Sequence, residues 1–382
     1  MSSRRHIGLI ALGGAGWMGG TNYVRGLAAA IRAASPETQV SFVCPERLLP
    51  DWRGENRVIP ISTQRTLRSL ILDRTPSLKS AIARAGIEFL YPITYASDFI
   101  VPPPIWQSWQ LGERGWAGWI PDFQHRYLPG FFTEKDIAWR EERIAALAER
   151  APCVVLSSES AAVDFREFYP AQAAKARVLT FATPPLELND AALAMDEVPP
   201  RFLLVCNQFW KHKNHAIILD ALRSLSARGI RPVVLCTGEL VDHRDPAYAE
   251  TIRVALRADG LGEQVKLLGL IPREQQVALM RRAVAIIQPS LFEGWSTIVE
   301  DARTLGRPSL LSSIAVHREQ NPPGARFFDP HAPEALADLI AEAWADWPAG
   351  PDRDAERAAQ DRATKRLAEV GRSFLALASA CR

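Results

Sequence analysis

The sequence lacks the long apolar runs, the paired cysteines and the one-sided charge that mark several protein classes. No stretch of about 18 apolar residues is present, and residues 1–6 lead into a short strand-like run rather than a signal peptide. The 45 basic residues nearly balance the 43 acidic residues, which argues against a nucleic-acid binder. With 47% hydrophobic and 23% charged residues, the composition excludes disorder for the whole chain. We expect a folded cytoplasmic protein.

The five cysteines show neither disulfide-like nor metal-like spacing. They are Cys44, Cys153, Cys206, Cys236 and Cys381, and the first four lie in or beside apolar strand-like runs. We expect small buried thiols in a reducing compartment. We also expect no metal site, because the only Asp-x-Asp sequence, at residues 352–354, falls in a charged helical stretch.

Strand-like apolar runs alternate with helical segments along the chain. The runs that we interpret as strands cover residues 6–12, 39–45, 88–93, 153–157, 176–180, 201–207, 232–238, 264–269, 283–289 and 307–312. Continuous apolar strands separated by helices predict parallel sheets that are covered on both faces. The predicted fold class is therefore α/β.

Length and one break in this pattern set the domain prediction. At roughly 150 residues per domain, 382 residues suggest two or three domains. Residues 183–200 are rich in proline and acidic residues and weak in periodicity, which favours a linker between two domains. We predict an N-terminal domain over 1–183, a linker over 184–200, a C-terminal domain over 201–350, and a helical segment over 351–382 that packs back toward the N-terminal domain.

A glycine motif follows the first predicted strand. Gly14, Gly16 and Gly19 fit G-x-G-x-x-G, a pattern that lets a pyrophosphate approach a helix N-terminus. The acid expected to bind the ribose would be Glu46, which lies 27 positions past Gly19, whereas about 20 is usual. The motif leaves three alternatives: an NAD site, a loop that approaches a phosphate or substrate, and a structural turn. We favour the second.

The second half contains an acidic loop that leads into a helix. A predicted strand is followed by Glu293 in a loop, and a helix begins near Ser296. Ligands of open α/β sheets bind at the carboxyl ends of strands, so we expect the backbone N–H groups of Ser296 and Thr297 to be available to an anion. The alternative is that Glu293 is an ordinary loop acid and that Glu300 and Asp301 merely suit the helix dipole.

A basic turn follows the first predicted strand of the second half. Asn214 suits the N-cap of the next helix, and Lys213 precedes it at the positive end of that helix. Lys211, His212 and His215 add positive charge where a diphosphate could lie. The alternative interpretation is a solvated basic turn.

Several motifs, in order along the chain, resemble one enzyme family. FEGWSTIVEDA is similar to the signature of two glutamates separated by seven residues in the retaining glycosyltransferases of family 4, the mannosyltransferase-like group 1 glycosyltransferases. QFWKHKNH resembles their phosphate-binding turn, and LGLIPREQQVALMRRAVAIIQPS their base-binding loop, helix and strand. WMGGTNYVRGL, WIPDFQHRYLPGFFT, SSESAAVDFREFY and SSIAVHREQ are also similar. The resemblance implies a GT-B fold, in which two Rossmann-like doubly wound domains face a central cleft that holds a nucleotide-sugar.

The resemblance implies roles for individual residues around Glu293. Glu293 resembles the acid that contacts the donor hexose, and Lys213 resembles the lysine that binds the diphosphate. The second glutamate of the family signature falls on Asp301, and Glu300 lies one residue early, so either of them would hold the ribose.

Other positions complete the implied site. The family's usual Arg is Gln208 here, and Lys211 is the candidate to compensate. His125 resembles a first-domain histidine near the donor sugar, although many relatives have their histidine where this chain has Pro121. We predict Glu293, His125 and Lys213 as catalytic residues. The predicted donor-binding residues are Gly19, Gly20, Asn207, Gln208, Lys211, Lys213, Ile271, Glu293, Gly294, Trp295, Ser296, Thr297, Glu300 and Asp301.

Two further surfaces have candidate roles. Trp106, Trp109 and Trp116 could stack an acceptor sugar, with simple packing as the alternative, and Trp119 is predicted to lie in the core of a strand. Residues 65–85 form a basic amphipathic stretch that could touch anionic lipid, with a plain surface helix–turn–helix as the alternative.

The resemblance implies retaining transfer of a hexose from a nucleotide diphosphate-sugar to an oligosaccharide, polysaccharide or glycolipid, with no metal or other cofactor required. A GDP-mannose-type donor is slightly preferred over a UDP-sugar. The alternatives are a catalytically weakened homologue that serves as a binding or scaffold subunit, and an NAD-dependent oxidoreductase. A glycoside hydrolase is disfavoured, because Glu293 and Asp301 belong to one loop and helix and would not flank a substrate from two sides.

Overall fold

The computed structural model of the protein describes residues 5–14, 17–61, 78–96, 114–193, 198–242 and 244–381. The chain divides into two compact units. The first unit comprises residues 1–123, 133–184 and 365–382, and the second comprises residues 124–132 and 185–364. Helix α14 (Arg353–Ala380) contributes its first part to the second unit and its last part to the first.

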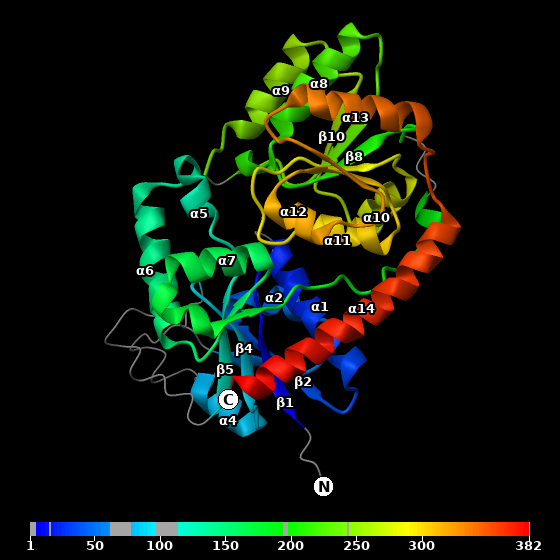
Figure 1. Cartoon of the computed structure of the whole chain (residues 1–382). Coiled ribbons are helices and arrows are strands. Elements are labelled where there is room, and N and C mark those ends of the chain that lie inside the picture. Colours follow the sequence, from blue (N-terminus) through cyan, green and yellow to red (C-terminus); the bar gives the residue numbers. More distant parts are fainter. Residues whose placement is uncertain are drawn as a thin grey trace. The chain divides into compact units, whose positions relative to one another are not determined.

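The first unit is a parallel sheet with the strand order β3-β2-β1-β4-β5-β6-β7. Figure 1 labels its strands β1, β2, β4 and β5. The strands are β1 (His6–Ile10), β2 (Gln39–Pro45), β3 (Val58–Ile61), β4 (Phe89–Thr94), β5 (Gly115–Ile120), β6 (Val154–Leu156) and β7 (Ala176–Val178). The helices are α1 (Met18–Ala34), α2 (Leu49–Trp52), α4 (Leu78–Ala85), α6 (Glu134–Arg150) and α7 (Glu159–Phe168), with 3-10 turns η1 (Glu46–Leu48) and η4 (Pro170–Lys175).

The last part of α14 packs into the core of the first unit. The ring of Phe374 lies 6.0 Å from that of Phe89 and 5.3 Å from that of Tyr91, both on β4. Gly371 meets the backbone of α1, since a Cβ atom there would lie 1.9 Å from the carbonyl oxygen of Ala30. Only glycine allows this approach.

A disulfide joins Cys153, just before β6, to Cys381, just after α14. The expectation of five reduced thiols is therefore wrong for this pair. The two residues are 228 positions apart in the sequence, so no spacing pattern could reveal them, but folding brings their Cα atoms within 5.9 Å. Cys44, Cys206 and Cys236 are buried free thiols, as predicted.

The second unit is a six-stranded parallel sheet with the order β10-β9-β8-β11-β12-β13. The strands are β8 (Leu203–Cys206), β9 (Val234–Thr237), β10 (Val265–Gly269), β11 (Ile286–Gln288), β12 (Ser309–Ser312) and β13 (Ala325–Phe328). The helices are α5 (Gln124–Tyr127), α8 (His215–Ala227), α9 (Tyr248–Ala258), α10 (Arg273–Arg282), α11 (Thr297–Thr304), α12 (Ala315–Gln320) and α13 (Pro333–Asp346), with 3-10 turns η3 (Pro129–Phe131), η5 (Ala191–Leu193) and η6 (Lys211–Lys213).

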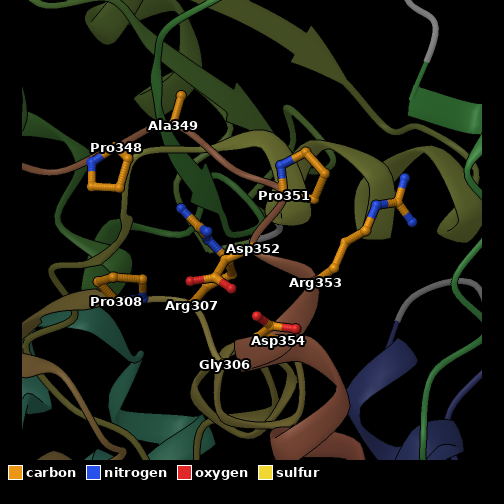
Figure 2. A pocket seen from close by; sticks show the side chains of 9 residues that line it. All are labelled: Gly306, Arg307, Pro308, Pro348, Ala349, Pro351, Asp352, Arg353 and Asp354. Carbon is orange, nitrogen blue, oxygen red and sulfur yellow. The ribbon is translucent and has the colours of Figure 1, made fainter.

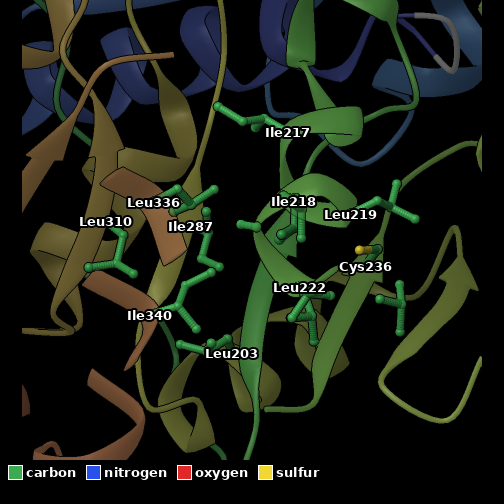
Figure 3. Close-up of a cluster of buried hydrophobic side chains, with 14 of the residues drawn as sticks. Leu203, Ile217, Ile218, Leu219, Leu222, Cys236, Ile287, Leu310, Leu336 and Ile340 are labelled. Carbon is green, nitrogen blue, oxygen red and sulfur yellow. The ribbon is translucent and has the colours of Figure 1, made fainter. Parts of the chain in front are cut away.

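Side chains of β8 alternate between two hydrophobic clusters, one on each face of this sheet. Leu203 and Val205 pack with residues of α8, α9 and α13, whereas Leu204 and Cys206 pack with residues of α10 and α11. Figure 3 shows the first cluster, in which Ile218 and other residues of α8 meet the strands. Burial on both faces explains why the strand sequences read as continuous apolar runs.

The described residues 185–193 and 198–200 of the predicted linker belong to the second unit. The Arg281 side chain on α10, only 1% exposed, binds Glu356 of α14 at 2.7 Å and Asp190 at 2.8 Å. The backbone N–H of Leu186 donates to Gln360 Oε1 at 3.1 Å. Residues 185–190 are thus fastened to α10 and to the start of α14.

The α/β prediction is confirmed, and each of the ten predicted strands is present with shifts of a few residues at its ends. β3 and β13 were not predicted, and β5 was anticipated only through Trp119, which is buried as expected. Within the described ranges, no helix has the length and apolar character that crossing a membrane requires.

Candidate active site

The strand order of the second sheet reverses its direction between β8 and β11. The chain proceeds from β8 toward one edge of the sheet and then returns to β11 on its other side, which makes this pair the switch point where ligands of open α/β sheets bind. At the carboxyl ends of these strands, Asn207 Nδ2 donates to Gln288 Oε1 at 2.9 Å. Gly238 allows the next loop to approach, because a Cβ atom there would lie 2.0 Å from Asn207 O.

Glu293 lies in the loop after β11, and one of its carboxylate oxygens is held by three donors. Oε1 accepts hydrogen bonds from Lys213 Nζ at 2.6 Å, Ser290 Oγ at 2.7 Å and Gln288 Nε2 at 3.0 Å. In the part of the chain that the structure describes, no residue bonds to Oε2. The carboxylate is therefore fixed through one oxygen and has the other for a ligand.

The electrostatics of this cluster favour the ionised form of Glu293. Burial alone would raise the pKa of Glu293, but attraction to Lys213 and the hydrogen bonds from Lys213 and Ser290 lower it below its ordinary value. The Lys213 and Glu293 side chains are 15% and 10% exposed, so they form a poorly solvated ion pair.

The turn after β8 brings Lys213 to Glu293. Asn214 sits at the N-cap position of α8 as predicted, but in the left-handed region at φ 56°, and its side chain makes no capping hydrogen bond. Instead, Asn214 Nδ2 donates to Pro289 O at 3.2 Å and to Pro330 O at 3.0 Å. Asn214 therefore ties the basic turn to the loop that contains Glu293.

The other residues of this turn divide between charge and packing. Lys211 is exposed and pairs with Asp245 at 3.3 Å, while its backbone N–H donates to Asp242 Oδ2 at 2.9 Å. His212 is buried, and desolvation, together with the charges of Lys213 and Arg244, lowers its pKa well below the ordinary value. Gln208 lies half-buried between β8 and the turn.

Helix α11 begins after Ser296, whose Oγ accepts the hydrogen bond of Val299 N at 3.4 Å. The predicted helix start is therefore correct. The expectation that the N–H of Ser296 is available to an anion is wrong, because it donates to Gln320 Oε1 at 3.1 Å. Gln320 lies 24 residues downstream on α12, beyond the reach of local sequence patterns. Gly294, Trp295 and Thr297 are partly exposed around this start.

Glu300 and Asp301 point to different neighbours. Glu300 is 1% exposed and accepts a hydrogen bond from Gln320 Nε2 at 3.0 Å, with Arg303 Nε 3.5 Å from its other oxygen. Asp301 pairs with Arg273 at 2.7 Å, and Arg273 is 42% exposed. Cys206 is the last residue of β8, and its pKa is raised mainly by burial. The charges of Asp301 and Arg273 also act on Cys206, so the ion pair of Asp301 with Arg273 lies near the end of β8. Ile271, two residues before Arg273, packs partly against the core.

His125 belongs to α5, which is part of the second unit, and its buried ring lies 6.4 Å from that of Phe132. The segment 124–132 is held there by Arg244, which donates to Gln124 Oε1 at 3.0 Å and lies 5.0 Å over the Phe132 ring. The Tyr127 ring stacks on Phe292, next to Glu293, at 5.3 Å.

Gly19 and Gly20 lie in the first unit beneath the indole of Trp17. A Cβ atom on Gly20 would lie 2.7 Å from the Trp17 ring, and one on Gly19 would lie 3.2 Å from its Nε1. The Trp17 ring stacks in turn on Trp119, with centroids 6.1 Å apart. These glycines therefore make room for an aromatic side chain at the start of α1.

The predicted acceptor tryptophans are only partly described. Trp106 and Trp109 lie outside the described residues, as do residues 65–77 of the predicted lipid-binding stretch. Trp116 is half-buried at the second position of β5, near the amino end of the strand. In α4, Ile82 is buried and Arg84 is exposed.

A separate pocket of about 460 Å³ lies at the amino ends of the strands of the second sheet, away from Glu293 (Figure 2). It is lined by Pro308, which directly precedes β12, and by residues at the start of α14, including Asp352 and Asp354. Asp352 caps α14 by accepting the N–H of Ala355 at 3.0 Å. Across the described ranges, no cluster of three or more His, Cys, Asp or Glu side chains could hold a metal ion.

No role was predicted from the sequence for four residues around Glu293 and Asp301, namely Gln288, Ser290, Arg273 and His317. Gln288 and Ser290 flank the proline that ends β11 and could have been noticed as polar residues at a strand end. Arg273 lies in a motif that was recognised without a role for this residue. His317 lies in SSIAVHREQ, which also had none.

Residues 195–365 match the model of a family described as glycosyl transferases group 1. This match falls almost wholly within the second unit, which contains the Glu293 cluster. No curated protein sequence matches the chain.

Solved structures match both units. Sucrose-phosphate synthase from Thermosynechococcus elongatus is 19% identical, with a TM-score of 0.70 over 98% of this chain and 100% of that one. HepE from Anabaena, in complex with UDP and glucose, is 16% identical, with a TM-score of 0.70 over 99% and 100% of the chains. A glycosyltransferase from Rickettsia africae is 14% identical, with a TM-score of 0.67 over 98% of both.

The fold is GT-B. The two parallel-sheet units are its two Rossmann-like domains, as predicted. Together with the family match over residues 195–365, the GT-B fold supports a group 1 glycosyltransferase.

Proposed function

We propose that this protein is a retaining hexosyltransferase that uses a nucleotide diphosphate-sugar as its donor. The observation that carries the proposal is the Glu293 cluster at the switch point of the second sheet. There a carboxylate is fixed through Oε1 and has a second oxygen for a sugar hydroxyl, while Lys213 lies 2.6 Å away to meet a diphosphate.

Breaking a glycosyl–phosphate bond leaves negative charge on the diphosphate. Lys213 would stabilise that charge, with help from the amide end of α11, which is electrostatic catalysis by groups already in place. In our proposal a donor phosphate oxygen takes the proton of the acceptor, the anomeric configuration is retained, and no metal is required. His125 is the proposed contact to the donor sugar from the segment 124–132.

Asp301 is the better candidate for the ribose than Glu300. Glu300 is engaged with Gln320 and Arg303 on the side of α12, whereas Asp301 lies with Arg273 near the end of β8. A ribose hydroxyl could donate to Asp301 while Arg273 continues to bind its other side.

For the donor we propose two candidates, which differ in their base and their sugar. The sequence resemblance slightly favours a GDP-mannose-type donor. The Anabaena HepE structures were solved with UDP and with UDP-glucose, which supports UDP-hexoses as equal candidates for this chain.

For the acceptor we propose an oligosaccharide, polysaccharide or glycolipid that meets aromatic side chains of the first unit. Among the described tryptophans, Trp17 follows β1 and lies at the carboxyl edge of the first sheet, where ligands bind, whereas Trp116 is near the amino end of β5. Peripheral contact with anionic membrane through residues 65–85 is part of the same proposal. Sedimentation with anionic vesicles at low salt tests it, and no sedimentation would contradict it.

A thermal-shift panel of nucleoside diphosphates and their sugars, followed by product assays with the best ligand, tests the proposed function. We expect stabilisation by one nucleoside diphosphate, and stereochemical analysis of the product to show retention. Stabilisation by NAD(H) and by no nucleoside diphosphate would overturn the proposal. Binding of a nucleotide-sugar without any transfer would favour the catalytically weakened homologue, which has its support in Gln208, Asp301 and Pro121.

A further inference from the structure

His317 lies on α12, behind the loop that contains Glu293, and its side chain is fully buried. Its Nδ1 atom is 3.0 Å from Ser312 Oγ and 3.0 Å from Ser312 O. Ser312 is the last residue of β12, the strand that pairs with β11. The imidazole is therefore anchored at the carboxyl edge of the sheet, next to the proposed donor site.

The hydrogen bonds decide which ring nitrogen of His317 carries the proton. Ser312 Oγ has a single proton, and it donates this proton to Ser290 O at 2.6 Å. Ser312 Oγ and O can then only accept from His317, so Nδ1 carries the proton. Desolvation lowers the pKa of His317 to about 4 although Glu293 attracts its charged form, so the ring is neutral at neutral pH. Within the described residues, the buried Nε2 has no hydrogen-bond partner.

The same residues lead on to Glu293. Ser312 holds the backbone carbonyl of Ser290, and the side chain of Ser290 donates to Glu293 Oε1 at 2.7 Å. His317 thus fixes Ser312, Ser312 fixes the backbone of Ser290, and Ser290 orients the carboxylate. A catalytic group held by such supports keeps the narrow geometry that transfer requires.

We propose that His317 is a positioning residue for Glu293, acting through the Nδ1 proton, Ser312 and Ser290. The proposal deepens the proposed function, because it rests on Glu293 contacting the donor hexose. His317 then does more than stabilise the fold, and the orientation of Glu293 depends on one of its ring nitrogens, Nδ1.

Two amide substitutions distinguish the ring nitrogens. His317→Asn places an amide N–H near the position of Nδ1, whereas His317→Gln places its amide near the position of Nε2 and removes the donor to Ser312. We expect His317→Gln and Ser312→Ala to lower kcat roughly 10- to 100-fold with little change in the KM of the donor, because the carboxylate is misplaced while the nucleotide contacts remain. His317→Asn and Ser312→Thr should retain most of the activity.

Equal kcat values for His317→Asn and His317→Gln would overturn the proposal, as would losses that follow only the Tm of each variant. Crystal structures of wild type and His317→Gln give a test that needs no activity. We expect Glu293 Oε1 to leave Ser290 Oγ in the variant, and an unchanged Glu293 would contradict the proposal. A wild-type protein that transfers no hexose would instead contradict the proposed function, and the two crystal structures would still decide the role of His317.

Discussion

The carboxyl edges of the two sheets use opposite chemistry on the same parallel α/β plan. In the second unit, amides and charges meet at the strand ends, with Asn207 bound to Gln288 and Lys213 bound to Glu293. In the first unit, aromatic rings gather there, and Tyr23 stacks on Trp119 with centroids 4.1 Å apart. In our proposal the charged edge meets the diphosphate of the donor and the aromatic edge meets the sugar of the acceptor.

A buried pair of tyrosines in the first unit and the buried Glu293 in the second unit also differ in charge. The hydroxyls of Tyr23 and Tyr91 hydrogen-bond to each other inside the first unit, and burial raises the pKa of both still further above neutral pH. In the second unit the pKa of Glu293 is lowered, and this carboxylate is ionised. The proposed chemistry therefore depends on the charges of the second unit.

Removing the charged pair of the second unit should have the largest effect. Glu293→Gln and Lys213→Ala should each lower kcat roughly 100- to 1000-fold, because each removes a group that we propose to stabilise the transition state. Steady-state transfer assays measure this, with circular dichroism to confirm folding. The matched controls are Glu263→Gln and Lys266→Ala, two exposed residues of the same unit. Full activity in both Glu293→Gln and Lys213→Ala would refute the site assignment.

Acid should destabilise the second unit more than the first. Burial is the main cause that lowers the pKa of three histidines in the second unit, to about 3 for His215, to about 4 for His317 and well below 6.5 for His212. The unfolded chain binds protons at these sites below pH 6.5, whereas the folded unit does not. Each site therefore costs about 1.4 kcal/mol of stability per pH unit as the pH falls from 6.5 toward its folded pKa.

Hydrogen exchange measured for individual peptides at pH 7.5 and pH 5.5 distinguishes the stability of the two units. We expect protection to fall further in the second unit than in the first, where the pKa of His6 is also lowered by burial. His215→Leu should make the second unit less sensitive to acid, because it removes one of the three sites. Equal loss of protection in both units would break the comparison.

Asp301 and Glu300 should differ in their effect on donor binding. Asp301→Asn should raise the KM of the donor about tenfold with a smaller change in kcat, because it weakens a charge-assisted hydrogen bond to the ribose. Glu300→Gln should mainly lower the Tm, since Glu300 is buried among Gln320 and Arg303. The reverse pattern would move the ribose contact to Glu300.

The smallest expected effect is on the aromatic edge of the first unit. Trp17→Ala should raise the KM of the acceptor several-fold, in line with about 1 kcal/mol for one ring contact, and leave the KM of the donor unchanged. Trp139→Ala, which removes an exposed ring from α6, is the control. A change in donor KM alone would assign Trp17 to the donor side.

Sequence patterns predicted most strands that are buried on both faces, and among the edge strands they predicted β7 and β10 but not β3 and β13. The strand β8 is fully buried and reads as an apolar run, whereas β3 and β13 are edge strands with half-exposed residues and give a weak signal. Glu293, Lys213 and the helix start at Ser296 were found from local motifs. Contacts between residues that are distant in the sequence were not found. Those of Gln320 with Ser296 and of Cys153 with Cys381 arise only on folding.

Calorimetric titration of UDP, GDP and NADH into wild type and Lys213→Ala tests the central claim most directly. The account predicts that wild type binds UDP or GDP and not NADH, and that Lys213→Ala weakens this binding at least about tenfold, because a charge-assisted contact to the diphosphate is lost. Equal affinity of both proteins for the nucleoside diphosphate, or binding of NADH alone, would contradict it.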